Sequence, residues 1–193
     1  GYNVVATAES THKLITNFEL LNTHDTYALS GAGLEARRVL GKQSGEKLRQ
    51  LADKGFDTGS ELKVCAEHDI ETYVAPKKRI SSLKDPAFNK DRFHYNEEED
   101  TYTCPAHQTL RTNGRAYTRN RTSLKRAFKV KHYKLPFSVC NACEYRLSCA
   151  GEKTLSTSKG RYIERSEYQD YIDQNVARVE LNKQTYRRRQ QII

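Results

Sequence analysis

The sequence contains no methionine and no tryptophan, and none of its apolar runs approaches the roughly 20 residues that a membrane-spanning helix requires. These absences exclude a transmembrane segment, and no stretch has the layout of a secretory signal. The missing methionine, with a chain that starts at Gly1 and stops on Ile192 and Ile193, leads us to expect a piece of a longer protein. With 36% hydrophobic and 30% charged residues, the chain can form one domain with an insertion or two small domains.

Cysteine is scarce, and its five copies do not form an even set of pairs. An odd count, with one Cys-x-x-Cys pair and no secretory signal, is typical of a reducing compartment, where cysteines bind metals more often than they form disulfides. We therefore expect a cytoplasmic protein. Cys65 stands apart from the other four, on one face of a predicted helix, and we expect it to be a small buried apolar residue.

Acidic residues are sparse in the second half of the chain. Residues 1–100 hold 14 Lys and Arg against 17 Asp and Glu, whereas residues 101–193 hold 19 against 7, and the net charge of the whole chain is +9. Such asymmetry between halves points to an acidic partner, of which nucleic acid is the commonest. A solubilising surface would also be basic, but it does not explain why the charge is segregated.

The first 76 residues read as alternating strands and helices. Their apolar patterns and turn residues predict, in chain order, strands at 2–8 and 14–20 that form a hairpin, a helix at 27–40, a strand ending at 51, a helix at 59–68 and a strand at 70–76. Thr58 and Glu61 have the spacing of a capping box at the start of the second helix. The order β-β-α-β-α-β predicts the start of a mixed α/β sheet.

Asp53 lies at the centre of the stretch 51–57, where an apolar pair leads into a carboxylate and Gly55 permits a sharp turn before the next helix. A carboxylate at the tip of a strand is how α/β folds present metal-binding or acid/base groups. On the local pattern alone, an ordinary surface aspartate before a turn explains the stretch equally well.

After residue 76 the composition changes, and a basic run and an acidic run precede the clustered cysteines. We expect an insertion with its own small fold here. Beyond it, Ser166 and Gln169 form a capping-box pair, and apolar residues recur at helical spacing, which predicts one long helix from 167 to 193. The predicted domains are therefore 1–76, 77–160 and 161–193.

Four of the cysteines have a spacing that suits a metal ion. Cys104 stands alone, and Cys140, Cys143 and Cys149 follow it. A Cys-x-x-Cys turn can place two thiolates on one tetrahedral ion, and two more complete a structural zinc site, which stabilises a short insertion with little core. A degraded site and free thiols are the alternatives, and His107 is an alternative ligand. Catalysis by these thiols is not expected, because no Cys–His nucleophile arrangement is nearby.

The stretch between Cys104 and Cys140 is the most one-sided in charge, since residues 111–134 include no Asp or Glu. Its basic residues are Arg111, Arg115, Arg119, Arg121, Lys125, Arg126, Lys129, Lys131 and Lys134, and Tyr117, Phe128, His132 and Tyr133 are interleaved with them. Guanidinium groups suit phosphates and aromatic rings stack on unpaired bases, so we expect nucleic-acid binding without base-specific readout. A solvated loop is the alternative, although such a loop normally mixes signs.

Motifs in this order and spacing resemble those of bacterial insertion-sequence transposases of the DDE type. Gly-Tyr-Asn-Val, Ala-Glu-Ser and His-Lys-Leu-Ile in residues 1–15 are similar to the first strand pair, and Ala-Asp-Lys-Gly-Phe-Asp at 52–57 to the segment with the second catalytic aspartate. Tyr-x-Cys-Pro at 102–105 and the cysteines at 140–149 resemble the cysteine-bearing insertion of one branch. Tyr-Arg-Arg-Arg-Gln-Gln-Ile-Ile at 186–193 resembles the helix that leads to the catalytic glutamate.

The resemblance implies an RNase H-like fold, in which a zinc-ribbon-like insertion interrupts a mixed sheet and a long C-terminal helix closes it. It implies three carboxylates that hold two Mg²⁺ or Mn²⁺ ions for DNA strand cleavage and transfer. Asp53 is then a metal ligand and Glu9 a second one. Arg189 contacts DNA or the active site, and a solvated surface charge is the alternative for it. The implied partners are transposon ends and target DNA at the bacterial nucleoid, with no membrane, and the intact protein would be a homo-oligomer.

The chain departs from the family pattern at three places. Glu9 stands where aspartate is usual and reaches one methylene further, which would shift a metal that demands near-ideal octahedral geometry. The third carboxylate is expected just past Ile193, and His107 replaces a usual glycine. We therefore expect a transposase parent and a segment that is inactive alone. A structure-selective nuclease of similar fold and a non-catalytic zinc-containing DNA-binding module are the alternatives. The module predicts that Glu9 and Asp53 lie far apart, whereas the enzyme places them on adjacent strands.

Overall fold

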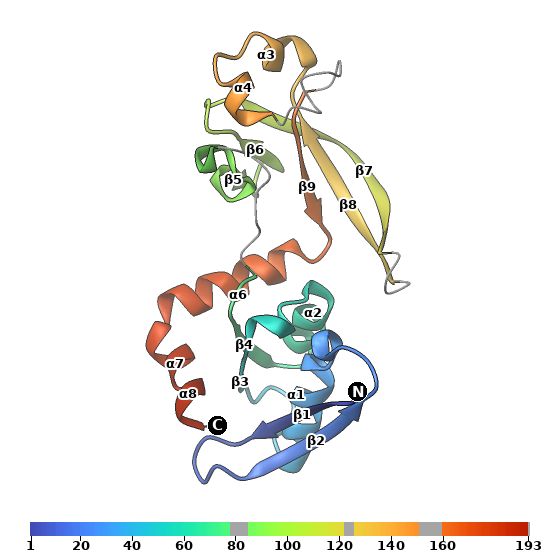
Figure 1. The fold of residues 1–193 in the computed structure, drawn as a ribbon, viewed down its shortest axis with the longest axis vertical. Coiled ribbons are helices and arrows are strands. Elements are labelled where there is room, and N and C mark those ends of the chain that lie inside the picture. The colour runs from blue at the N-terminus through green and yellow to red at the C-terminus, as the bar shows by residue number, and fades with distance from the viewer. Residues whose placement is uncertain (78–84, 122–125, 151–159, 193) are drawn as a thin grey trace. The chain divides into compact units, whose positions relative to one another are not determined.

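The computed structural model describes residues 1–77, 85–121, 126–150 and 160–192 and shows a protein of the α/β class (Figure 1). The chain divides into two compact units, Gly1–Lys78 with Tyr168–Ile193, and Arg79–Glu167. Residues 161–167, which the sequence analysis assigned to the last domain, thus lie in the second unit. No helix in the described part of the chain is both long enough and apolar enough to cross a membrane.

The first unit contains the strands and helices that the sequence predicts, in the predicted order. They are β1 (Asn3–Ala8), β2 (Ile15–Leu21), α1 (Leu29–Val39), β3 (Leu48–Ala52), α2 (Gly59–Glu67) and β4 (Ile70–Val74), with 3-10 helices η1 (Asp25–Tyr27) and η2 (Lys54–Phe56). β1 and β2 form the expected antiparallel hairpin, in which Val4 lies opposite Leu20. Val5 faces Ala28 and Ala32 at the start of α1, whereas Val4 and Leu20 on the other face are exposed.

The second sheet of this unit is a parallel pair covered by helices. β3 and β4 pair with Leu48 opposite Ile70 and Ala52 opposite Val74. The core cluster consists of Leu29, Leu62, Cys65, Ile70 and Val74, which come from α1, α2 and β4. The prediction that Cys65 is buried is confirmed, and burial raises the pKa of its thiol to about 12, so that it stays neutral at physiological pH.

A single mixed sheet does not form among the described residues. The hairpin β1–β2 and the parallel pair β3–β4 are separate two-stranded sheets. Helix α1 packs on both, because Ala32 lies against the hairpin and Leu29 belongs to the core cluster with Ile70 and Val74. The two sheets are therefore joined through a helix and not through strand pairing.

The capping box predicted at the start of α2 is wrong in its contacts. Thr58 is the N-cap residue, but its side chain makes no capping hydrogen bond. The carboxylate of Glu61 instead accepts hydrogen bonds from the backbone N–H and the hydroxyl of Ser30, at 3.0 and 2.7 Å. Glu61 therefore satisfies a first-turn N–H of α1, where helix geometry also favours negative charge.

The single long helix predicted at the end of the chain is three shorter ones, α6 (Gln169–Leu181), α7 (Lys183–Arg187) and α8 (Arg189–Ile192). The first break falls at Asn182, whose backbone leaves helical geometry (φ −122°, ψ 48°) and whose amide donates to the carbonyl of Arg178 at 3.0 Å. Asparagine side chains compete with the helix ladder in this way. The predicted capping pair is also absent, because Ser166 ends β9 and Tyr168 is the N-cap, with no side-chain capping bond.

Helix α6 covers the open edge of β4 with polar side chains. Asn175 is fully buried, and its amide accepts from the backbone N–H of Val74 at 3.0 Å and donates to the Val74 carbonyl at 2.8 Å. Arg178 Nε donates to the carbonyl of Thr72 at 3.0 Å. These two side chains take the place of a neighbouring strand and satisfy backbone groups that are costly to bury unpaired.

The second unit is built on one antiparallel sheet with the strand order β5-β6-β7-β8-β9. The strands are β5 (His94–Asn96), β6 (Thr101–Thr103), β7 (Thr109–Arg121), β8 (Arg126–Lys134) and β9 (Tyr162–Ser166), and the short helices are η3 (Pro86–Phe88), η4 (Lys90–Arg92), α3 (Phe137–Asn141) and α4 (Arg146–Cys149). One face of the sheet forms a core of Phe93, Tyr102, Leu110, Tyr133 and Ile163.

Asp100, at the end of the acidic run, anchors this core. Its backbone is left-handed (φ 47°) just before β6. Its carboxylate accepts hydrogen bonds from Tyr95 at 2.8 Å, Tyr133 at 2.6 Å and Lys131 Nζ at 2.8 Å. Partial burial alone would raise the pKa of Asp100, but these hydrogen bonds, led by that from Lys131, lower it to about 2.

We expect Asp100→Asn to lower the free energy of unfolding by about 1–2 kcal/mol at neutral pH, because a partly exposed carboxylate loses charge-assisted hydrogen bonds. The folded-state pKa of about 2 lies below the ordinary value of 3.8. The carboxylate therefore stabilises the fold fully above the ordinary value and progressively less as the pH falls through the folded value. Denaturant melts should show the gap between variant and parent closing over this range. A stability difference that stays constant with pH would contradict the role assigned to the Asp100 carboxylate. Asparagine is the chosen replacement because it tolerates the left-handed backbone at this position.

Candidate nucleic-acid interface and cysteine cluster

The basic stretch forms a long antiparallel hairpin, β7–β8 (Figure 1). Pairing runs from Arg111 opposite Lys134 to Arg121 opposite Arg126, with an irregularity between Thr112 and Ala116. The charge of this stretch is evident from the sequence, but its strands were not predicted. A signal for β8 is present in residues 128–133, where Phe, Val and His at even positions alternate with Lys and Tyr at odd ones.

The two faces of this sheet differ in what they contact. Successive residues of a strand point to opposite faces, and directly paired residues share one. Tyr133 and its partner Ile163 turn into the core, so the even-numbered residues of β8 lie on the opposite face. Tyr117, which pairs with Val130, lies on that second face too.

Two of the predicted DNA-binding cations are used within the unit. Arg119 pairs with Glu164, and Lys131 Nζ lies 2.8 Å from the Asp100 carboxylate. Exposed or half-buried cations with no ion-pair partner among the described residues are Arg111, Arg115, Lys129 and Lys134. The side chains of Arg121 and Arg126 and the whole of Lys125 lie outside the described residues, and their predicted role stays a prediction.

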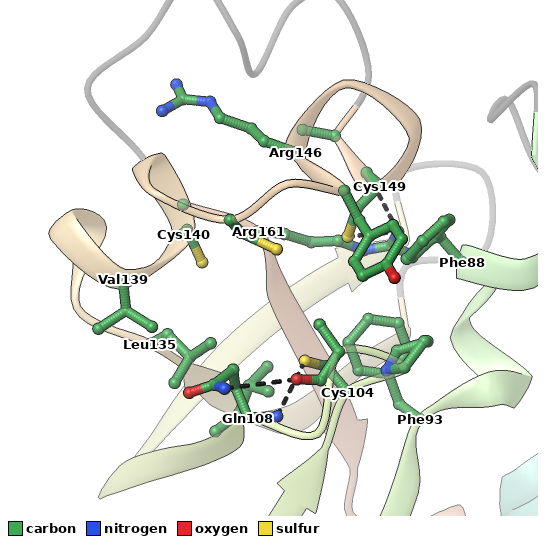
Figure 2. A pocket seen from close by; sticks show the side chains of 17 residues that line it. Phe88, Phe93, Cys104, Gln108, Leu135, Val139, Cys140, Arg146, Cys149 and Arg161 are labelled. Carbon is green, nitrogen blue, oxygen red and sulfur yellow. Dashed lines mark hydrogen bonds between the residues drawn. The ribbon is translucent and has the colours of Figure 1, made fainter.

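The structure brings the four predicted metal ligands to one cavity of about 50 Å³ (Figure 2). Cys104 follows β6, Cys140 lies in α3, Cys143 follows α3 and Cys149 ends α4. The remaining lining is largely apolar and includes Leu135. Four thiols from three separate segments therefore face a common space.

Hydrogen-bond donors stand beside two of these sulfurs. The backbone N–H of Gln108 donates to Cys104 Sγ at 3.4 Å, and Arg161 Nη1 lies 3.6 Å from Cys149 Sγ and donates to the Cys149 carbonyl at 2.7 Å. Such donors favour thiolate over thiol. Neither Gln108 nor Arg161 was predicted from the sequence, because their roles depend on contacts that the chain pattern does not encode.

Burial raises the pKa of the Cys140 and Cys149 thiols, and the neighbouring cysteines raise both further. The cysteines are free and form no disulfide. Gly160 packs closely here, since a Cβ at this position would lie 3.1 Å from Cys140 Sγ. The cluster thus offers four thiols, the donor type that structural zinc sites use.

The four cysteines are the right type of donor for a metal ion, but their sulfur atoms are not close enough together to hold one. Among the described residues no three His, Cys, Asp or Glu side chains are grouped closely enough to hold an ion as they stand. His107, the alternative ligand, does not line the thiol cavity and lines a second depression together with Asp85, His94 and Cys104. The four thiols would have to move closer together to bind an ion.

Asp53 follows β3 directly, as predicted, and its side chain is 60% exposed. Its Oδ1 accepts from the backbone N–H of Lys54 at 2.7 Å, which begins η2. Arg189 Nη1 of α8 lies 3.1 Å from the same oxygen, and its guanidinium also stands 5.2 Å over the Tyr186 ring. The first residue of the last helical segment therefore contacts the residue that follows β3.

Glu9 follows β1 directly, but its carboxylate accepts hydrogen bonds from the turn that comes after the strand. It accepts from the backbone N–H groups of Thr11, His12 and Leu14 at 2.7, 2.5 and 3.3 Å. Burial would raise the pKa of Glu9, yet these three hydrogen bonds lower it. Since β1 and β3 belong to different sheets, Glu9 and Asp53 do not lie on adjacent strands, contrary to what was expected for the enzyme.

Comparisons of the chain with protein-family models, with curated proteins and with solved structures found no match. Three arrangements within the chain itself bear on its function: the basic hairpin, the cysteine cluster and the contact between Asp53 and Arg189.

Proposed function

We propose that this chain acts in DNA transposition, as part of the catalytic region of a transposase of the DDE type, and that it binds DNA through the hairpin β7–β8. The observation that carries the proposal is a hairpin whose described cations face no acidic residue within its own strands. Arg111, Arg115, Lys129 and Lys134 have no described ion-pair partner and are available to phosphates. Transposon ends and target DNA are the implied ligands.

Asp53 supports the catalytic part of the proposal. A parallel strand pair with a carboxylate at the carboxyl end of one strand is the local arrangement that an RNase H-like fold uses. The ion pair with Arg189 brings the last helix to this carboxylate, as the motif resemblance implies for the segment that leads to the third carboxylate. Mg²⁺ or Mn²⁺, when bound by such a set, activates the attacking oxygen and stabilises the leaving one.

The described residues do not make a two-metal site by themselves. Glu9 is committed to its own turn, Asp53 is paired with Arg189, and no third carboxylate joins them in the described part of the chain. We therefore assign no catalytic step to these residues and propose that the segment is inactive alone.

We further propose a structural zinc ion held by Cys104, Cys140, Cys143 and Cys149. Its support is the shared cavity, the donors beside two of the sulfurs and the small apolar core of this unit. A bound zinc ion would cross-link the segment after β6 to the helices α3 and α4. This cross-link would hold the base of the hairpin in place.

The test of DNA binding is the dependence of duplex affinity on salt. About six phosphate contacts would give a slope of log K against log salt of roughly −5. A chain that does not bind duplex DNA at low salt would refute the proposal.

The second candidate function is a non-catalytic, zinc-containing DNA-binding module. The observation that favours it is that Glu9 and Asp53 end strands of different sheets. Both candidate functions use the hairpin to bind DNA. They differ in whether Asp53 is a metal ligand.

Binding of Mn²⁺, followed by electron paramagnetic resonance, distinguishes the two candidates. If Asp53 is a metal ligand, Asp53→Asn should weaken Mn²⁺ binding by about 10-fold or more, since a lost ligand removes a charged oxygen from a hard cation. Asp91→Asn, at an exposed aspartate of the other unit, is the matched control and should have no effect. Equal Mn²⁺ binding by the parent and Asp53→Asn would favour the module.

A further inference from the structure

Three aromatic rings stand side by side on the face of the second unit's sheet that is turned away from the core. Tyr117 of β7 and His132 of β8 are stacked, with ring centroids 4.5 Å apart and planes within 9°. Tyr162 of β9 lies on the other side of His132, with a centroid distance of 5.1 Å and a tilt of 46°. Since β8 lies between β7 and β9, the three rings form a short column across the sheet, which we call the aromatic column.

The two outer residues of the aromatic column are partly exposed to solvent, and the Tyr117 hydroxyl accepts a hydrogen bond from Asn113 at 3.0 Å. Tyr117 is 38% exposed and Tyr162 is 48% exposed, whereas Tyr133 on the core face is fully buried. The His132 side chain, in the middle, is 28% exposed. Large aromatic rings are normally covered when their role is to build a core, so the outer tyrosines present ring surface that the fold itself does not use.

The charge around the aromatic column is positive. Arg115 lies in the irregular part of β7 two residues before Tyr117, and Lys134 lies directly opposite Tyr162 across the strand pair. Both are exposed and have no ion-pair partner among the described residues. Glu164 also lies on this face, but its carboxylate is paired with Arg119 and lies 3.2 Å from His132 Nε2. Lys134 therefore places a cation suited to a phosphate backbone on the same face as the stacking surface, and Arg115 lies nearby along β7.

We propose that the aromatic column is a stacking platform for unpaired bases, so that this unit binds single-stranded DNA as well as duplex. This inference rests on the proposed DNA-binding function. In a duplex each base is already stacked on its neighbours, so a protein ring can add a stack only where a base is unpaired. A base that stacks on Tyr117 or Tyr162 extends the column, while Arg115 and Lys134 contact the adjoining phosphates. Stacking of this kind is tolerant of sequence, because every base has an aromatic face.

The experiment measures binding of the whole chain to fluorescein-labelled oligo-dT and to a duplex of the same length by fluorescence anisotropy. Tyr117→Ala and Tyr162→Ala should each weaken oligo-dT binding by about 5- to 100-fold and leave duplex binding unchanged. Tyr117→Phe and Tyr162→Phe keep the rings and should bind both ligands like the parent. Tyr2→Ala, at an exposed tyrosine of the first unit, is the matched control.

A second readout separates stacking from a merely structural role. An oligo-dT that carries 2-aminopurine should lose fluorescence on binding the parent or the Phe variants, because its base stacks, and should not do so with the Tyr117→Ala, Tyr162→Ala double variant. Thermal melts by circular dichroism establish that each variant is folded. Unchanged oligo-dT affinity in folded alanine variants, or an equal loss for duplex, would overturn the proposal. Tighter binding of oligo-rU than of oligo-dT would overturn the assignment to DNA.

The outcomes also separate this proposal from the DNA-binding function on which it rests. Duplex binding that persists while the alanine variants bind oligo-dT normally would remove the stacking platform and keep the function. A chain that binds neither ligand would remove both.

Discussion

A chain in which Arg111, Arg115, Lys129 and Lys134 are all replaced by glutamine should lose most of its affinity for duplex DNA and most of the salt dependence of that affinity. Each phosphate contact contributes about 0.9 to the slope of log K against log salt, so four lost contacts should reduce its magnitude by about 3 to 4. The affinity should fall by roughly 10²- to 10³-fold near 0.1 M salt. The measurement is a set of anisotropy titrations over a range of salt concentrations.

These four positions are chosen because their side chains have no ion-pair partner among the described residues, so that their replacement should leave the fold intact. Arg119 and Lys131 are left in place, since Glu164 and Asp100 depend on them and their removal would leave carboxylates unpaired. The matched control replaces Lys13, Lys47, Lys54 and Lys183 of the first unit, which are exposed, have no ion-pair partner among the described residues and change the net charge by the same amount. If both sets of replacements reduce the slope equally, the net charge of the chain and not the hairpin governs binding.

Removal of the proposed zinc ion should strongly destabilise the second unit. The purified protein should carry about one equivalent of zinc, and Cys143→Ser should lose it. Because structural zinc sites contribute folding energy directly, chelation should abolish the cooperative unfolding of the second unit and leave the helical signal of the first unit in place. Zinc content is measured by atomic absorption and unfolding by circular dichroism.

Cys65 provides the control for this experiment. It is a fully buried residue of the first unit, remote in sequence from the cluster, and Cys65→Ala removes one thiol while leaving the four ligands intact. That variant should keep its zinc even though it is somewhat less stable. Zinc retained in full by Cys143→Ser would show that the thiols do not form the site.

The elements of the first unit could be predicted from the sequence because their patterns are local. A run of β-branched and small residues marked β1, and Leu62 and Cys65 at helical spacing marked α2. The contacts between elements were not predictable in the same way. Glu61 had the spacing of a capping residue, yet tertiary packing directs it to Ser30 of α1. The break at Asn182 was hidden because the apolar stripe continues across it.

The residues of the candidate sites could be identified from the sequence, but their arrangement in three dimensions could not. The four cysteines were identified by spacing, and they do line one cavity. The basic stretch was identified by its charge, but its strands were not predicted, because clear period-two alternation is confined to part of β8 and Asn113 and Gly114 interrupt β7. The aromatic column could not be foreseen, since Tyr162 lies far along the sequence and reaches His132 only through the pairing of β8 with β9.

The bond between Asn175 and Val74 has a consequence for how the chain folds as it is made. The two residues are 101 positions apart, and the whole second unit is encoded between them. At synthesis rates of about 5–20 residues per second, the edge of β4 waits on the order of 5–20 s for α6 to arrive. During that time β4 is an unprotected edge strand, able to pair with another chain. Rapid folding of the inserted unit, which brings the ends of the insertion to a fixed separation, would shorten the search by which α6 finds the strand.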